Sequence, residues 1–127
     1  VWWIKEMLPH DQLTAMLTAA DLFICPSIYE PLGIVNLEAM GCETAVLGSR
    51  VGGIPEVVAD KETGELVDYN GEAAPFEKAL AESITRLMSQ PELLKKYGAA
   101  GRVRAQKLFG WDAVAALTVD LYRKVIG

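Results

Sequence analysis

Short apolar runs alternate along the chain with longer segments in which apolar residues recur every three or four positions. The runs at residues 1–4, 22–25, 45–47 and 65–67 have the length and composition of strands. They are largely apolar at consecutive positions, which is typical of strands with both faces covered. The pattern therefore predicts a parallel sheet flanked by helices, an α/β fold of the Rossmann-like kind.

Helical spacing accounts for most of the remaining chain. Helices are expected over residues 9–20, 34–42, 55–58 and 75–90, with two more that begin at Pro91 and at Trp111. Proline suits the first turn of a helix, where its missing N–H has no intrahelical acceptor to bond. No internal repeat or low-complexity linker interrupts this alternation.

Composition and charge exclude several function classes. The net charge is −5, with 51% hydrophobic and 23% charged residues, whereas affinity for nucleic acid or anionic lipid needs clustered Lys and Arg. No apolar stretch approaches the roughly 20 residues of a membrane span, and no signal peptide is visible. Cys25 and Cys42 are expected to be reduced thiols in the core, so a cytoplasmic protein fits best.

The loop at residues 26–33 is the most informative segment for function. Ligands of open parallel sheets bind beyond the carboxyl ends of the strands, and this loop follows such an end. Gly33 lies where the loop enters the next helix, so the first amides of that helix lack intrahelical partners. A helix terminus of this kind attracts phosphate, and Glu30 lies just ahead of it.

Glu38 is an acidic residue in a predicted helix that is apolar nearly all round. We expect this helix to be buried, and a buried carboxylate is costly unless its oxygens are hydrogen-bonded or paired. Ligand hydroxyls, such as those of a ribose, would satisfy it. Pairing with an Arg or Lys elsewhere in the chain is the alternative.

The spacing of Glu30 and Glu38, with seven residues between them, resembles the donor-site motif of retaining glycosyltransferases of the GT-B fold, family 4. The matching segments cover essentially the whole chain and read PSIYEPLGIVNLEAM at 26–40, VGGIPEVV at 51–58, ETG at 62–64 and FGWD at 109–112. Within the family, the amino-acid sequence of the first segment looks most like that of the actinobacterial glycogen synthases, which are α-1,4-glucan glucosyltransferases. The resemblance implies that residues 1–127 are part of a C-terminal nucleotide-sugar-binding domain.

The resemblance also implies roles for individual residues. Glu30 would contact the hydroxyls of the donor sugar and act as the catalytic residue, by orienting the sugar and stabilising charge. Glu38 would contact the ribose. The positions implied to bind the donor are Pro31, Leu32, Gly33, Ile34, Glu38, Gly52 and Gly53, although Gly52 and Gly53 are equally consistent with a plain turn. Members of the family usually need no metal or other cofactor, and they keep the anomeric configuration.

Several expectations concern what the chain would lack relative to the family. The acceptor domain and the basic pair that neutralises the diphosphate would lie upstream, so we expect the chain alone not to turn over. The first predicted strand would be unpaired or would pair with another copy. An apolar face on the last helix would be exposed and favour self-association. Glu43 stands where many relatives have a small residue, and Ala45 where they have proline.

The remaining candidates for chemistry are weaker. His10 is the only histidine, which excludes a serine–histidine or cysteine–histidine system and a multi-histidine metal site. Trp2, Trp3 and Trp111 could stack on sugar rings, but buried anchors are the expected role. Alternative functions are a family 4 hexosyltransferase acting on mannose, N-acetylglucosamine or a lipid-linked acceptor, a non-catalytic nucleotide-sugar-binding domain, and a sugar-nucleotide epimerase.

Overall fold

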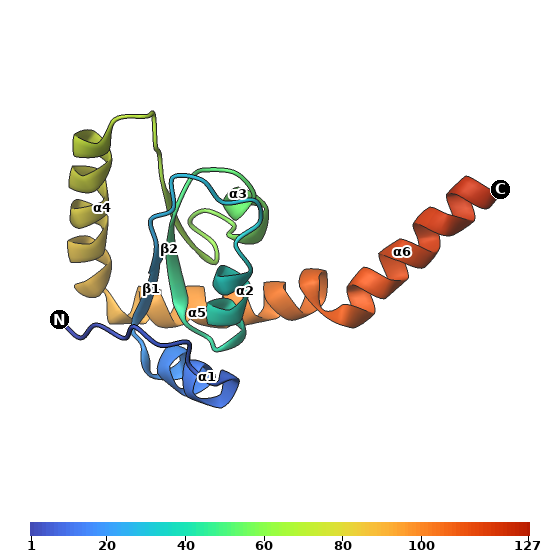
Figure 1. The fold of residues 1–127 in the computed structure, drawn as a ribbon, viewed down its shortest axis with the longest axis horizontal. Coiled ribbons are helices and arrows are strands. Elements are labelled where there is room, and N and C mark those ends of the chain that lie inside the picture. Colours follow the sequence, from blue (N-terminus) through green and yellow to red (C-terminus); the bar gives the residue numbers. More distant parts are fainter.

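The computed structural model describes residues 1–127 as a single α/β unit with three strands and six helices (Figure 1). In chain order the elements are α1 (His10–Ala19), β1 (Leu22–Cys25), α2 (Ile34–Gly41), β2 (Ala45–Ser49), α3 (Ile54–Val57), β3 (Gly64–Val67), α4 (Ala73–Met88), α5 (Pro91–Phe109) and α6 (Trp111–Ile126). The predicted alternation of strands and helices is confirmed from the first helix onward.

The sheet is parallel throughout, in the order β1-β2-β3. The central strand β2 is buried at all five of its positions and runs two residues beyond its predicted end. Neighbouring residues of β2 point to opposite faces of the sheet. Val46 accordingly packs into one hydrophobic cluster, and Ala45 and Leu47 pack into another.

These two clusters form the core on either side of the sheet. One holds buried side chains of α1, α2 and α3, and the other holds those of α4 and the first half of α5. Figure 1 shows α4 on one side of the strands and α2 and α3 on the other, with α5 running across below them. Both faces of the sheet are therefore covered, as the apolar strands predicted.

The prediction of a buried strand at residues 1–4 is wrong. The segment has no regular structure, and Trp2 and Trp3 are exposed. A short apolar run becomes a strand only when a neighbouring strand takes its backbone hydrogen bonds, and the sheet offers it none. Of the two expected states of this segment, the structure shows the unpaired one.

The last helix is also more exposed than a core element. In α6 no residue is buried, and the helix projects away from the sheet (Figure 1). The expectation that Trp2, Trp3 and Trp111 are buried anchors is wrong, because all three side chains are exposed and Trp111 opens this projecting helix. The expected exposed apolar face is confirmed.

Candidate functional site

Two loops meet beyond the carboxyl ends of the strands. One follows β1 and contains Glu30, and the other follows β2 and contains Gly52 and Gly53. The Gly53 amide donates a hydrogen bond of 3.0 Å to the carbonyl of Glu30. The Ser49 hydroxyl donates another to the carbonyl of Ser27. The structure thus brings together the two predicted loops of the donor site.

The glycines of the second loop allow this close approach. A Cβ on Gly52 would lie 1.8 Å from the carbonyl oxygen of Glu30, and one on Gly53 would lie 2.4 Å from that of Pro31. Any larger residue would push the loops apart. The turn therefore lies directly against the backbone of the first loop, at Glu30, Pro31 and Leu32.

Glu30 and Gly33 are joined at the start of α2. Gly33 is the residue that caps this helix and has a left-handed backbone with φ 85°. Its amide donates a hydrogen bond of 3.0 Å to Oε1 of Glu30. The amides of Ile34 and Val35 donate to no acceptor, as predicted for a helix terminus. A carboxylate and free amides therefore stand at one helix end.

Glu38 departs from its predicted environment. It is half-buried rather than buried, because α2 turns only Asn36, Ala39 and Met40 fully into the core. No basic partner and no hydrogen bond engages its carboxylate, so the alternative of a fixed ion pair is not observed. Glu38 lines a hollow of about 280 Å³ against the end of α5, with Phe109 among the other lining residues. That hollow does not include Glu30 or Gly33.

The other predicted contact residues are Pro31 and Leu32 in the first loop and Ile34 at the first position of α2. Pro31, Leu32 and Ile34 are exposed. Their backbones lie next to the helix terminus, where a donor could reach them. Most of the predicted contact residues thus cluster around the start of α2, and Glu38 lies farther along it.

Asn36 lies beside Gly33 at the start of α2 and was not among the residues singled out from the sequence. Its side chain is fully buried, yet neither Nδ2 nor Oδ1 has a hydrogen-bond partner. The atom Nδ2 would lie 2.5 Å from a Cβ placed on Gly33. The signal in the sequence was a polar residue three and four positions ahead of Ala39 and Met40, on the same helical face.

Arg50 is a cation directly after β2, but its charge is already engaged. Its guanidinium donates to Asp60 at 2.6 Å and to Asp68 at 2.7 Å. Burial alone would raise the pKa of Asp60, but the hydrogen bonds from Arg50 and from the Leu66 amide outweigh it and lower that pKa. Arg50 therefore ties together the segments that follow β2 and β3.

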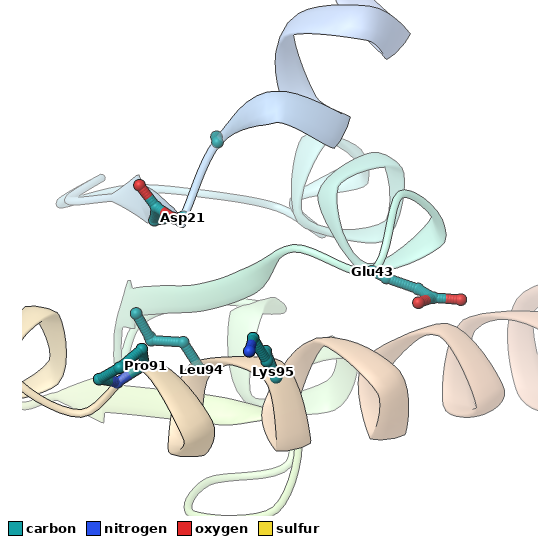
Figure 2. A pocket seen from close by; sticks show the side chains of 6 residues that line it. Asp21, Glu43, Pro91, Leu94 and Lys95 are labelled. Carbon is teal, nitrogen blue, oxygen red and sulfur yellow. The ribbon is translucent and has the colours of Figure 1, made fainter.

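A second hollow, of about 140 Å³, lies at the opposite edge of the sheet (Figure 2). It is bordered by residues that precede β1 and β2 and by the start of α5, namely Ala20, Asp21, Glu43, Pro91, Leu94 and Lys95. This edge holds the amino ends of the strands, whereas ligands of open parallel sheets bind at the carboxyl ends. The hollow contains none of the predicted site residues.

Two structural observations bear on metals and membranes. No three His, Cys, Asp or Glu side chains come close enough together to hold a metal ion. None of the helices combines the length and the apolar character needed to cross a membrane.

Comparison with known proteins gives a consistent family. The family model described as "Glycosyl transferases group 1" matches residues 3–104. The alpha-maltose-1-phosphate synthase of Mycolicibacterium smegmatis is 52% identical over 126 residues, which are 98% of this chain and 33% of that protein. The MMP alpha-(1->4)-mannosyltransferase of Mycolicibacterium hassiacum is 38% identical over 120 residues, covering 94% of this chain and 28% of that protein.

A solved structure supports the same relationship. Sucrose-phosphate synthase from Thermosynechococcus elongatus superposes with a TM-score of 0.80 and 39% identity, over 94% of this chain and 29% of that one. The predicted architecture, a parallel sheet flanked by helices as in the C-terminal domain of GT-B glycosyltransferases, is confirmed. The chain spans about a third of the length of the curated relatives that it matches first.

Proposed function

This chain belongs to the glycosyl transferases group 1 family, and we propose that it forms the donor-binding site of a retaining glucosyltransferase. The observation that carries the proposal is the junction at the start of α2. There Glu30, the Gly33 amide and the turn at Gly52 and Gly53 converge beyond the carboxyl ends of β1 and β2. A nucleotide sugar offers diphosphate oxygens for such amides and hydroxyls for such a carboxylate.

We assign different residues to different parts of the nucleotide sugar. The free amides of Ile34 and Val35, at the positive end of the helix dipole, suit the diphosphate. Glu30 suits the hydroxyls of the sugar. Glu38 suits the ribose hydroxyls, and the absence of a basic partner leaves its carboxylate available for them. Pro31, Leu32, Gly52 and Gly53 shape the loops around these groups.

The reaction that fits these groups is transfer with retention of the anomeric configuration. The bond from the anomeric carbon to the diphosphate oxygen breaks, and a hydroxyl oxygen of the acceptor bonds to that carbon on the same face. The acceptor's proton passes to the departing phosphate. Glu30 orients the sugar and stabilises the positive charge that develops on it. We expect no metal requirement.

The acceptor is proposed to present the 4-hydroxyl of a glucose unit. An α-1,4-glucan, as in glycogen synthesis, is one such acceptor. The relative named alpha-maltose-1-phosphate synthase, at 52% identity, favours a second one. A maltose 1-phosphate product forms when a glucosyl group joins the 4-hydroxyl of glucose 1-phosphate. Because one relative is named as an α-1,4-mannosyltransferase, a mannosyl donor is the alternative within the family.

The proposal is tested on the native full-length protein with a matrix of donors and acceptors. ADP-glucose, UDP-glucose and GDP-mannose are each incubated with glycogen or with glucose 1-phosphate, and the products are separated and weighed by mass spectrometry. We expect glucosyl transfer to one of the two acceptors and none from GDP-mannose. Transfer of mannose, or donor binding without transfer to any sugar acceptor, would refute the proposal.

Two controls address the site and the extent of the chain. Glu38→Gln is expected to weaken binding of the nucleotide roughly tenfold, the effect of about one charged hydrogen bond. Equal binding by wild type and variant would count against the ribose role. The 127-residue chain alone is expected to show no turnover, because Arg50, the cation directly after β2, is already bound to Asp60 and Asp68 and the helix-terminal amides alone stabilise the departing diphosphate weakly.

A further inference from the structure

Asn36 is the one residue with buried side-chain polar atoms that make no hydrogen bond. It is fully buried, and neither Nδ2 nor Oδ1 makes a hydrogen bond. Buried polar groups are nearly always paired, so an exception asks for an explanation in strain or function. An aliphatic residue at this position of α2 would fill the same core without that penalty.

The carboxamide of Asn36 lies against the proposed donor site. Its Nδ2 would be 2.5 Å from a Cβ on Gly33, and the Cγ of Glu30 would be 3.4 Å from the same point. The Asn36 amide and the stem of Glu30 therefore flank one Cα atom. The Asn36 side chain supplies two N–H groups that have no acceptor. The Glu30 side chain supplies a carboxylate that accepts a hydrogen bond of 3.0 Å from the Gly33 amide.

In the proposed complex, two groups compete for the hydrogen bond of the Gly33 amide: the Glu30 carboxylate and the bound sugar. In the structure this amide is the only group that donates a hydrogen bond to the Glu30 carboxylate. When a hydroxyl oxygen of the bound sugar accepts a hydrogen bond from this amide, it takes the place of the Glu30 carboxylate. The displaced carboxylate then needs another hydrogen-bond donor if it is to keep one orientation toward the sugar. Asn36 offers one, because its buried Nδ2 has no acceptor and would lie 2.5 Å from a Cβ on Gly33, with the Cγ of Glu30 3.4 Å from the same point.

We propose that Asn36 is a positioning residue of the donor site. Its Nδ2 donates to the Glu30 carboxylate when a hydroxyl of the bound sugar accepts from the Gly33 amide. The inference rests on the proposed function, because it needs a sugar for Glu30 to contact. It explains why a polar group is kept in the core without a partner. The hydrogen bond that it lacks is made only with the donor in place, so stability is given up for orientation of the site.

A pure packing role makes the opposite prediction for function. If Asn36 only fills space, an apolar residue of similar size stabilises the fold and leaves donor binding unchanged. If Asn36 positions Glu30, the same change stabilises the fold and weakens the contribution of the sugar to binding. The diphosphate and ribose contacts do not depend on Glu30, so binding of the bare nucleotide is the internal reference.

The test compares wild type, Asn36→Leu and Asn36→Asp in the native full-length protein. Affinities for UDP and UDP-glucose, and for ADP and ADP-glucose, are measured by titration calorimetry, together with the Tm of each variant. In Asn36→Leu we expect an equal or higher Tm, unchanged affinity for the nucleotide and a roughly tenfold loss for the nucleotide sugar, the effect of one hydrogen bond to a charged group. Asn36→Asp keeps the shape but places a second carboxylate beside Glu30, so at least the same loss is expected.

The outcomes separate the two proposals. If wild type binds a nucleotide sugar and both variants bind it equally well, the role of Asn36 is overturned and the proposed function stands. If affinity for the bare nucleotide falls as much as that for the nucleotide sugar, the positioning role is likewise overturned. Failure of wild type to bind any nucleotide sugar overturns both. Should Asn36→Leu not fold, Asn36→Ala, which removes the carboxamide without adding a charge, decides the question by the same comparison of nucleotide and nucleotide sugar.

Discussion

Glu43 occupies a backbone conformation that glycine adopts at lower free-energy cost. Its φ is 62°, in the left-handed region that disfavours side chains. The Thr44 amide donates to the carbonyl of Ala39, and the Glu43 amide donates to that of Met40. These bonds are those of a Schellman motif, in which glycine is usual at the position of Glu43.

Replacing Glu43 by glycine is therefore expected to stabilise the protein. The free energy of unfolding should rise by about 1 kcal/mol, because the left-handed strain is removed. The exposed contact with Arg102, at 3.6 Å, offsets this by only a few tenths of a kcal/mol. Urea unfolding at constant m-value measures the gain. Glu43→Ala removes the same contact but keeps the strain, so an equal gain in both variants would contradict the explanation.

Gly53 tests the contact between the two loops of the site. A Cβ on Gly53 would lie 2.4 Å from the carbonyl oxygen of Pro31 and 2.6 Å from the Cα of Leu32. Gly53→Ala is therefore expected to displace the first loop and weaken nucleotide-sugar binding at least tenfold, measured by titration calorimetry. Gly41→Ala is the matched control, since nothing lies within 4 Å of its Cβ position and alanine favours a helix. Unchanged binding in Gly53→Ala would show that the donor does not depend on this contact.

At the scale of elements, Glu65 joins β3 to two helices. Its buried carboxylate accepts from Arg86 of α4 and from the hydroxyl of Tyr97 of α5, at 3.4 Å, and from Lys61 at 2.5 Å. Burial alone would raise the pKa of Glu65, but the hydrogen bonds from Arg86 and Lys61 outweigh it and lower that pKa below its ordinary value of 4.5. The ionised form of Glu65 is thus favoured by folding.

This direction fixes how stability depends on pH. A carboxylate whose pKa is lowered in the folded state stabilises the protein above its ordinary pKa, and the contribution is lost as the pH falls below 4.5. Glu65→Gln should lower the free energy of unfolding at pH 7 by about 2 kcal/mol. It should also flatten the loss of stability between pH 5 and pH 3, measured by urea unfolding.

A surface pair on α4 provides the control for Glu65. Lys78 and Glu82 are 3.9 Å apart and largely exposed, so Glu82→Gln is expected to change stability by less than about 0.5 kcal/mol. If Glu65→Gln proves equally mild at pH 7, the carboxylate does not hold the two helices to the sheet.

Local patterns were enough to predict most elements and the loop that holds Glu30 and Gly33. They failed where the outcome depends on partners distant in sequence. Residues 1–4 are apolar but find no strand to pair with. Helix α2 is apolar on several sides, so its sequence does not tell which face is buried, and Glu38 lies beside that face while Asn36 lies on it. The contact of Gly52 and Gly53 with the first loop likewise emerges only from the meeting of two strand ends.

At the scale of the whole molecule, α6 presents an apolar stripe with nothing packed on it. Val114, Leu117, Leu121 and Val125 lie on one face at helical spacing, and Leu117 is 67% and Val125 76% exposed. Figure 1 shows the helix projecting from the body. Exposed apolar faces of this kind drive association in water, because pairing two of them removes apolar surface from solvent.

The 127-residue chain is therefore expected to self-associate through α6. Sedimentation velocity should show an oligomer that dissociates as the protein is diluted. Leu117→Lys combined with Leu121→Lys places two charges on the stripe and should shift the chain to monomer, because burying an unpaired charge is costly. Ala116→Lys adds a charge on another face of the same helix and should leave the oligomer intact. If the wild-type chain stays monomeric, or if Ala116→Lys dissociates it as well, the apolar stripe is not what holds the copies together.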